Sequence, residues 1–194
     1  MESEKDPIRL FAKLYELYRQ QGVAVPSAMV LATASPEGKP SARVVLLREF
    51  DAGCFVFYTN FASRKARELN ANPYAALCFY WEPIDYQVRV EGTVQHVSEP
   101  EADAYFAKRP RGSQIGAWAS RQSSVLTSRS ELEQRFRDYE TRFAGQDVPR
   151  PDFWSGFHLV PDSIEFWKRR ENRLHNRTRY QKTGEGWSVQ YLYP

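Results

Sequence analysis

The sequence predicts a mainly β fold with inserted helices, in the α+β class, whose antiparallel strands close into a barrel. Short runs rich in β-branched and aromatic residues recur along the chain and are separated by turn-forming residues. Helical patterns interrupt groups of these runs and do not alternate with single ones. That arrangement favours an antiparallel barrel over a doubly wound parallel sheet.

The N-terminal half begins with a helix and continues as strands. Apolar residues recur at helical spacing over residues 7–21, and Asp6 with Pro7 supplies an N-cap followed by proline at the first helical position. The next strand-like runs cover residues 28–34, 42–47 and 54–59, and turn residues at 35–38 and 50–53 predict an antiparallel meander. A short polar helix is expected over residues 60–72, followed by strands over 74–81 and 87–97.

The C-terminal half begins with helices and returns to strands. Helical patterns cover residues 99–108 and 128–143, and the polar segment 110–124 between them predicts a loop or a short helix. Further strands are expected over residues 153–160, 163–168, 177–181 and 187–191. We therefore expect one domain over residues 1–194, with an N-terminal helix (1–22), main barrel strands (28–97), a helical insertion (98–146) and C-terminal strands (153–194).

The composition predicts a globular, cytoplasmic protein. Hydrophobic residues make up 42% of the chain and aromatic residues 14%, which is enough for a core. No stretch approaches the roughly 20 apolar residues of a membrane helix, and the charged start is unlike a signal peptide. The formal charge of +3 is small for a dedicated nucleic-acid binder and suggests a local anion site. We expect neither a membrane nor a nucleic acid as partner.

Motifs that would define other chemistries are missing from the sequence. There is no GxGxxG fingerprint, no P-loop around Gly38 and Lys39, and no HExxH or GxSxG motif. Cys54 and Cys78 form neither a CxxC pair nor a cluster with the histidines. We therefore expect buried thiols and no metal site.

A first group of polar residues stands at the ends of apolar strands. Arg43 begins one run, Tyr58 and Thr59 end the next, and Arg64 and Lys65 begin the helix that follows. Guanidinium, ammonium and hydroxyl groups beside a helix N-terminus are the donors that a phosphate monoester requires. These residues are therefore a candidate phosphate cradle; the alternative interpretation is solvated surface charge.

Two further groups carry candidate binding residues. Tyr105 and Arg109, in a group that also includes Ser113, stand four residues apart on one helix face, so both can reach one anion; the alternative is an ordinary helix end. The third group consists of Trp167, Arg173, His175 and Arg177. A flat anionic ligand can be held by these residues, which provide an aromatic ring, two cations and a histidine. The alternative interpretation is an exposed basic turn between strands.

Read in order, these segments resemble the pyridoxamine 5′-phosphate oxidase family over almost the whole chain, from Asp6 to Pro194. The matching motifs are AMVLAT (28–33), KPSARVVLL (39–47), FYTN (57–60), SRK (63–65), QVRVEG (87–92), RPRGSQIGAW (109–118), QSS (122–124), EFW (165–167) and RLH (173–175). The collinear succession of these motifs carries the resemblance.

The resemblance implies a split β-barrel homodimer with FMN at the subunit interface. It implies that FMN is bound by Arg43, Val44, Val45, Leu46, Tyr58, Thr59, Arg64, Lys65, Gln87, Gln122, Ser123, Trp167 and Arg177. It implies that a small phosphorylated pyridine substrate is held by Arg48, Tyr105, Arg109, Ser113, Arg173 and His175, with Arg173 and His175 as catalytic residues. The implied reaction oxidises pyridoxamine or pyridoxine 5′-phosphate to pyridoxal 5′-phosphate, with molecular oxygen reduced to hydrogen peroxide.

Several positions depart from the family pattern. Arg48 stands where lysine is usual, Tyr86 and Tyr191 stand where arginine is common, and Asn176 replaces an aspartate. We also expect the N-terminal arm of the family, which can fold over the substrate, to be missing, because the chain begins almost at Asp6. Arg48 keeps the positive charge of lysine, but its guanidinium presents a fork of donors where an ammonium presents a single point donor. These departures bear on substrate identity more than on the fold.

Two other functions fit parts of this pattern. An oxidase of the phenazine-biosynthesis type shares the barrel and the Arg-Leu-His turn, and the C-terminal residues Tyr191 and Tyr193 favour it mildly. A non-enzymatic flavin- or RNA-binding module is the other alternative, because residues 168–179 are rich in arginine.

Overall fold

The computed structural model describes residues 4–50 and 53–194. Its helices are α1 (Pro7–Arg19), α2 (Arg64–Ala71), α3 (Glu99–Ala107), α4 (Arg111–Ala119) and α5 (Arg129–Arg142), with single 3-10 turns at Glu82–Ile84 and Glu171–Arg173. Its strands are β1 (Ala28–Ala34), β2 (Pro40–Leu46), β3 (Phe55–Asn60), β4 (Tyr74–Trp81), β5 (Tyr86–His96), β6 (Trp154–Lys168), β7 (Asn176–Thr183) and β8 (Gly186–Leu192).

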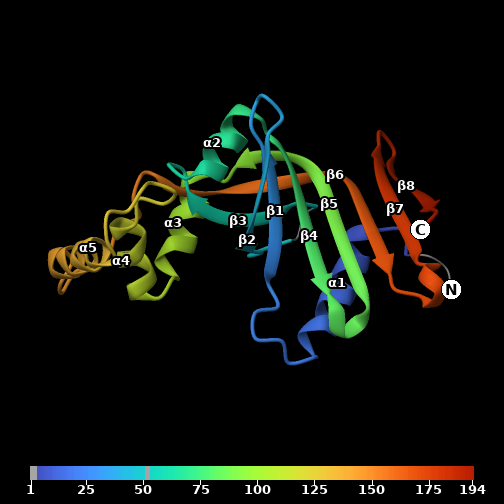
Figure 1. Cartoon of the computed structure of the whole chain (residues 1–194), viewed down its shortest axis with the longest axis horizontal. Coiled ribbons are helices and arrows are strands. Elements are labelled where there is room, and N and C mark those ends of the chain that lie inside the picture. Colours follow the sequence, from blue (N-terminus) through green and yellow to red (C-terminus); the bar gives the residue numbers. More distant parts are fainter. Residues whose placement is uncertain (1–3, 51–52) are drawn as a thin grey trace.

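One antiparallel sheet connects all of these strands, in the order β2-β1-β4-β5-β6-β7-β8, with β3 also paired to β6. Strand β6 organises the sheet: β5 lies along one of its edges, and β3 and β7 share the other edge, β3 on the first part of β6 and β7 on the last. A bridge between Glu49 and Val56 joins the chain beyond β2 to β3 and closes the barrel. The expected mainly β fold is confirmed, with α3, α4 and α5 to one side of the barrel and the β7–β8 hairpin at the opposite end (Figure 1).

The predicted meander over the first three strands is wrong. Strands β1 and β2 form a hairpin, but the other neighbour of β1 is β4, and β3 pairs with β6. Phe55, Val56 and Phe57 are all buried, whereas alternate residues of β2 are exposed. A strand that buries both faces belongs inside the fold, and a position beside the edge strand β2 would leave one face open. The predicted turn at 50–53 lies partly outside the described residues.

One predicted boundary also differs from the structure, because the two strands expected over 153–168 are one continuous strand, β6. The short helix that was one of the two expectations for 110–124 is present as α4. Pro161 lies inside β6, opposite Gly92, where the register between β5 and β6 shifts. Proline lacks an N–H group and is tolerated at such a bulge. Position 92 requires glycine, because a Cβ there would lie 2.0 Å from the Val160 carbonyl oxygen.

Three apolar clusters hold the described part of the fold together, and the smallest of them contains Val56, Val97 and Ala102. In the barrel, Phe11 of α1 packs against Phe55, Phe79 and Trp81, with ring centroids 5.0, 5.0 and 5.2 Å away. The second cluster lies between the helical insertion and the start of β6 and includes Trp154. This second cluster fixes the insertion helices against the barrel, and the cavity described below lies at that junction.

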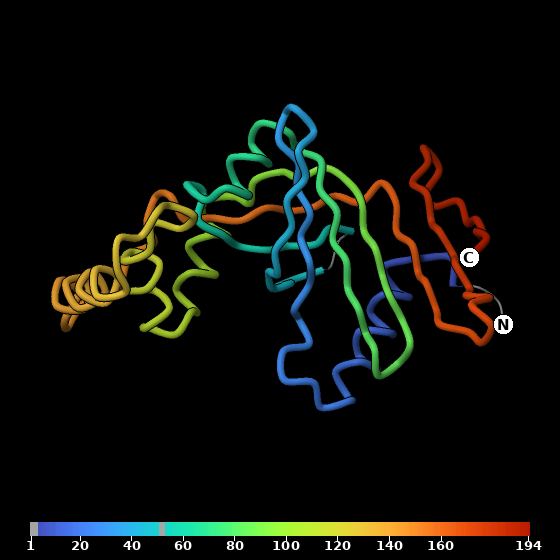
Figure 2. Tube along the Cα trace, viewed as in Figure 1, coloured from blue at the N-terminus to red at the C-terminus, as the bar shows by residue number. Residues whose placement is uncertain are grey.

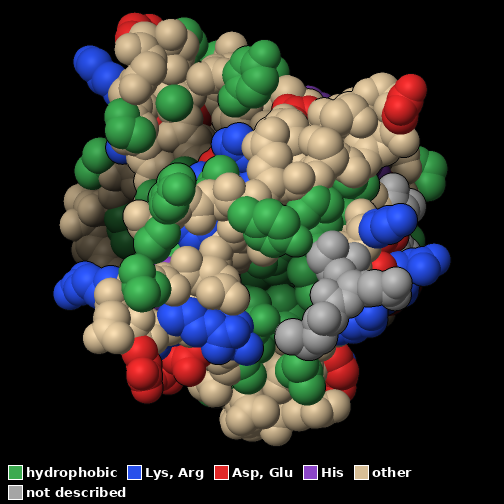
Figure 3. All heavy atoms as spheres, turned by 90° about the vertical axis from the view of Figure 1, so that its right-hand side faces the viewer, with side chains coloured by type: hydrophobic (Ala, Val, Ile, Leu, Met, Phe, Trp, Pro, Cys, Tyr) green, Lys and Arg blue, Asp and Glu red, His purple; other side chains and the backbone are tan. Residues whose placement is uncertain are grey.

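The first described residues and the C-terminal end of the chain lie together at the β7–β8 hairpin (Figure 2). The Tyr180 hydroxyl of β7 donates to the Glu4 carbonyl at 2.6 Å. At this end, Lys and Arg side chains lie in separate groups with Asp and Glu between them, and not as one basic patch (Figure 3). Among the residues that the structure describes, no helix has the length and apolar character needed to cross a membrane.

Candidate functional site

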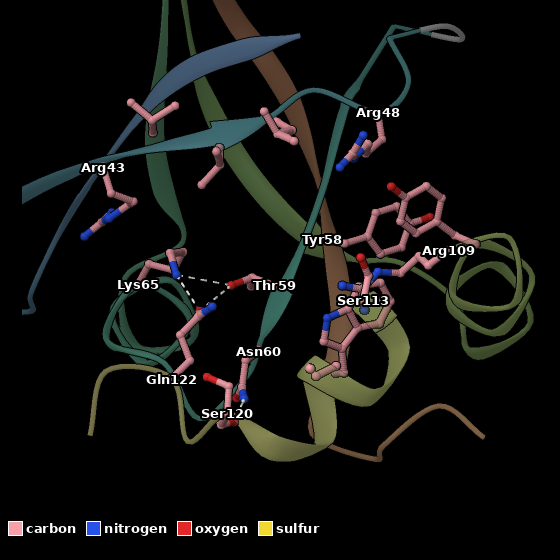
Figure 4. A pocket seen from close by; sticks show the side chains of 17 residues that line it. Arg43, Arg48, Tyr58, Thr59, Asn60, Lys65, Arg109, Ser113, Ser120 and Gln122 are labelled. Atoms are coloured by element: carbon pink, nitrogen blue, oxygen red, sulfur yellow. Dashed lines mark hydrogen bonds between the residues drawn. The ribbon is translucent and has the colours of Figure 1, made fainter. Parts of the chain in front are cut away.

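A cavity of about 490 Å³ lies between β2, β3 and the helical insertion. Of the residues expected to bind FMN, it is lined by Arg43, Val44, Val45, Leu46, Tyr58, Thr59, Lys65 and Gln122. Of the residues expected to hold the substrate, it is lined by Arg48, Tyr105, Arg109 and Ser113. In Figure 4, Arg43 and Lys65 lie on one side of β3 and Arg48 and Arg109 on the other, so the cavity has two cationic ends.

The first end is built around Lys65, at the start of α2. Ser63 caps this helix by accepting from the Ala66 N–H, which places Lys65 in the first turn facing the cavity. The ammonium donates to Gln122 Oε1 at 2.7 Å and to Thr59 Oγ1 at 3.3 Å, and no ion pair to a described carboxylate involves it. Burial, and then the nearby charge of Arg43, lower the pKa of Lys65 to about 8. A desolvated cation of this kind fits an incoming phosphate.

Arg43 is held from behind by a buried carboxylate, Glu68. Arg43 Nη1 donates to Thr33 Oγ1 at 2.6 Å, and its Nη2 lies 3.5 Å from Glu68 Oε2. Burial alone would raise the pKa of Glu68, but hydrogen bonds from Ser41, Thr33 and Arg64 outweigh it and lower that pKa to about 2. Glu68 therefore stays ionised and orients the guanidinium groups around it.

Arg64 differs from the other residues expected to bind FMN. Its Nε donates to Glu68 Oε1 at 2.8 Å, its side chain is 59% exposed, and it does not line the cavity. Glu68 was not among the expected site residues. Its position four residues after Arg64 on α2 was the available signal, and nothing in the sequence distinguished that pair from a surface ion pair.

The second end of the cavity combines arginines with aromatic rings. The Arg109 guanidinium carbon lies 4.6 Å from the Trp154 ring centroid, and Arg48 lies 5.7 Å from that of Tyr105. Arg109 Nη1 is buried and has no hydrogen-bond partner, and burial lowers the pKa of this side chain. A buried cationic donor is costly unless a partner accepts its hydrogen bond, so this end also fits an anionic group.

The rings at this end form a parallel stack. Tyr58 lies 4.0 Å from Tyr105 and 5.4 Å from Trp154, centroid to centroid, with interplanar angles of 9° and 6°. Tyr58 pairs across the sheet with Gly156, whose lack of a side chain lets the Tyr58 ring lie over the strand. A Cβ at Gly156 would lie 2.7 Å from Tyr58 Cδ1 and 2.8 Å from the Phe57 carbonyl oxygen.

Replacing Gly156 by alanine is therefore expected to lower the free energy of unfolding by about 1–3 kcal/mol, because the new methyl group overpacks this contact. Urea unfolding monitored by fluorescence measures the change. Gly112→Ala is the matched control, since a Cβ there meets nothing within 4 Å and the residue lies in α4. Equal stability of the Gly156→Ala protein and the wild type would contradict the close contact.

The remaining expected residues lie elsewhere in the chain. Gln87 and Trp167 are cross-strand partners on β5 and β6, and the Trp167 ring centroid lies 4.4 Å from that of His175. Trp167 and the cavity residue Trp154 stand near opposite ends of β6, which at about 3.3 Å per residue places them roughly 40 Å apart along the strand. Within one chain, these residues and the cavity are therefore separate groups.

Other residues of this distant group have distinctive local geometry. Arg177 makes a two-pronged pair with the buried Glu165 at 2.7 and 3.1 Å, which raises the pKa of Arg177. Arg173 and its neighbour Asn172 adopt φ values of 59° and 54°. Left-handed backbone at non-glycine residues costs about 1–3 kcal/mol each and is concentrated at functional sites.

Ser123, the remaining residue expected to bind FMN, also has a positive φ, of 70°. It follows Gln122 in the chain but does not line the cavity.

Some lining residues were missed by the sequence analysis. They are Asn60, Gly116, Ala117, Ser120 and Trp154. Three of them belong to α4 or its C-terminal end, in a segment for which a helix was only one of two expectations. Trp154 begins a strand that reads as core, and no signal in the sequence marks its contact with Arg109.

Comparison with known proteins gives matches along most of the chain. Residues 19–143 match the family model described as pyridoxamine 5′-phosphate oxidase, and residues 154–194 match that of the pyridoxine 5′-phosphate oxidase C-terminal dimerisation region. A pyridoxine/pyridoxamine 5′-phosphate oxidase from Myxococcus xanthus (strain DK1622) is 59% identical over 97% of this chain and 92% of its own length. One from Rubrobacter xylanophilus is 56% identical, covering 99% of this chain and 88% of that protein.

Solved structures agree with these matches. PhzG from Burkholderia lata 383, in complex with tetrahydrophenazine-1-carboxylic acid, has a TM-score of 0.94 and 30% identity, covering 100% of this chain and 95% of that chain. A pyridoxamine 5′-phosphate oxidase-related, FMN binding protein from Nostoc punctiforme has a TM-score of 0.75 at 20% identity, covering 94% of this chain and 96% of that chain. The second similarity supports the fold alone.

Proposed function

Because the chain belongs to the pyridoxamine 5′-phosphate oxidase family, we propose that it oxidises pyridoxamine or pyridoxine 5′-phosphate to pyridoxal 5′-phosphate, with FMN as cofactor and oxygen as acceptor. The alcohol and oxygen give the aldehyde and hydrogen peroxide; the amine, oxygen and water give the aldehyde, ammonia and hydrogen peroxide. The observation that carries the proposal is a cavity with one cationic end at Lys65 and a second at Arg109. Two such ends suit two phosphate groups, one on the cofactor and one on the substrate.

Each end of the cavity has its own role in this proposal. Lys65 and Arg43 hold the FMN phosphate, and Val44, Val45 and Leu46 provide a strip of strand for its flat ring. When bound, FMN supplies the hydride acceptor. Arg109, with Arg48, Tyr105 and Ser113, fixes the substrate by its phosphate, so that the reacting carbon is held in one orientation.

We further propose that the active site forms between two copies of the chain, which carries a dimerisation region at residues 154–194. The Gln87, Trp167 and Arg177 group, with Arg173 and His175, then faces the cavity of the partner. The separation of about 40 Å along β6 supports this arrangement, because one chain does not bring the two groups together. Exposed apolar side chains are available for such an interface: Val44 is 66% exposed and Tyr191 is 75% exposed.

Arg173 and His175 are the proposed catalytic residues of the completed site. A guanidinium fork at Arg173 orients the amine or alcohol of the substrate, and the imidazole of His175 takes part in its proton transfers. The His175 ring lies against Trp167, and its Nδ1 accepts from the Arg170 N–H at 3.2 Å. These contacts hold the imidazole in a defined orientation.

Hydrogen peroxide release tests the proposed function directly. The FMN-loaded protein should release hydrogen peroxide when given either 5′-phosphate ester in aerated buffer, and much less with unphosphorylated pyridoxamine, because the Arg109 end then lacks its anion. Bound FMN with no release from either ester would contradict the proposal. The phenazine-type oxidase, favoured by the similarity to PhzG, would then be the leading function.

A further inference from the structure

Arg109 is a charged side chain whose neighbours are aromatic and not acidic. No ion pair between Arg109 and a described carboxylate is present, whereas Arg43 has Glu68 and Arg177 has Glu165. The Arg109 guanidinium instead lies over two rings, Trp154 at 4.6 Å and Phe106 at 5.3 Å. Its Nη1 is buried and has no hydrogen-bond partner. The charge is thus held in place but is not neutralised.

Trp154 occupies a fixed position beneath this guanidinium. It is 6% exposed, begins β6, and lies in the parallel stack with Tyr58 and Tyr105. Phe106 contacts it in an edge-on arrangement, with the ring centroids 5.0 Å apart. Packing on several sides leaves the indole little freedom to move away from Arg109.

We propose that Trp154 is the positioning residue for Arg109, holding the guanidinium toward the cavity so that its full charge meets the phosphate of the substrate. The inference rests on the proposed function and adds to it a residue that does not itself contact the reacting atoms. A tryptophan face attracts a cation through its quadrupole and is the strongest aromatic partner for one. A carboxylate in the same place would compete with the substrate phosphate for the same N–H donors.

The two cationic ends therefore differ in how their arginines are held. Glu68 neutralises part of the charge at the Arg43 end, where Lys65 adds a second cation. At the Arg109 end, the neighbouring Arg48 also has a ring partner, Tyr105, at 5.7 Å. Ring partners at this end keep the local field positive, which suits a phosphate that arrives and leaves in every catalytic cycle.

The test compares Trp154→Leu, which removes the ring, with Trp154→Phe, which keeps an aromatic face. Four quantities are measured on the FMN-loaded dimer: kcat, KM for pyridoxine 5′-phosphate, the inhibition constant of inorganic phosphate as a competitor, and FMN affinity. We expect Trp154→Leu to raise KM and the phosphate inhibition constant together by about 2- to 30-fold. Its kcat and FMN affinity should stay within about twofold of wild type, and Trp154→Phe should recover most of the loss.

Trp118→Leu is the matched control, because Trp118 belongs to the same apolar cluster but packs on Tyr139 and Phe143, away from Arg109. An unchanged phosphate inhibition constant in folded Trp154→Leu would overturn the inference. Equal effects of Trp154→Leu and Trp118→Leu would also overturn it, since both would then report general packing. If the leucine variant does not fold, Trp154→Met, whose flexible side chain fills irregular space, replaces it. A wild-type protein that oxidises neither ester would refute the proposed function itself.

Discussion

Replacing Arg173 by alanine is expected to lower kcat by about 100- to 1000-fold, the usual cost of removing a preorganised donor from an active site. The variant should keep its FMN, because Arg173 is proposed to contact the substrate, whereas the FMN phosphate is held at the Lys65 end of the cavity. Stopped-flow reduction of the flavin by pyridoxine 5′-phosphate measures the chemical step, and the absorbance spectrum reports bound FMN. Arg173→Lys should recover only part of the rate, since an ammonium lacks the fork of a guanidinium.

Arg170→Ala is the control for this prediction, because Arg170 is also exposed and lies in the same turn. Its variant should keep the wild-type rate. Full activity of Arg173→Ala would remove Arg173 from the mechanism.

Mixed dimers distinguish a shared site from two independent ones. If each site combines the cavity of one chain with Arg173 of the other, Arg109→Ala and Arg173→Ala homodimers are both impaired. A heterodimer of the two then contains one intact site and regains activity. Failure of mixed dimers to regain activity would contradict the interface location that we propose, while leaving the role of Arg173 in place.

Local patterns in the sequence predicted most of the secondary structure. The cap at Asp6 and the strand-like run over residues 74–81 are local signals, and the elements they predicted are present. The neighbours of β3 were not predictable in this way, because strand pairing depends on which other strands bury both faces of Phe55, Val56 and Phe57. Local signals therefore gave the elements, and long-range burial decided their order in the sheet.

The candidate site likewise combines residues that local patterns grouped with residues that only long-range contacts bring together. Residues near one another in sequence, such as Thr59 and Lys65, were grouped correctly at one end of the cavity. The contact between Trp154 and Arg109 joins residues 45 positions apart, and the resemblance alone suggested that distant residues such as Gln87 serve the same cofactor. If the site combines two chains, as we propose, the pattern within one sequence does not show which of its local groups meet.

Changing Lys65 to methionine is expected to weaken FMN binding at pH 7 by about 2 kcal/mol, or about 30-fold, because the phosphate loses a charge-assisted donor. In the wild type, affinity should also depend on pH. The pKa of Lys65 is about 8 in the free protein, lowered by burial and by Arg43, and a bound phosphate dianion raises it again. Below pH 8 the lysine is charged whether or not FMN is bound, so affinity is constant. Above pH 8 binding takes up a proton, so affinity falls, by about tenfold between pH 7 and pH 9.

Fluorescence quenching of FMN, titrated with the apo-protein at pH 7, 8 and 9, measures both effects. The phosphate is a dianion throughout this range because its second pKa is about 6, so its own titration does not contribute. Riboflavin, which lacks the phosphate, should bind with the same affinity at all three values and to both proteins. Arg67→Met is the matched control, since Arg67 is an exposed cation on the same helix that does not line the cavity. A pH step of equal size in the Lys65→Met protein would assign the titration to another group, and unchanged affinity at pH 7 would exclude Lys65 from the phosphate site.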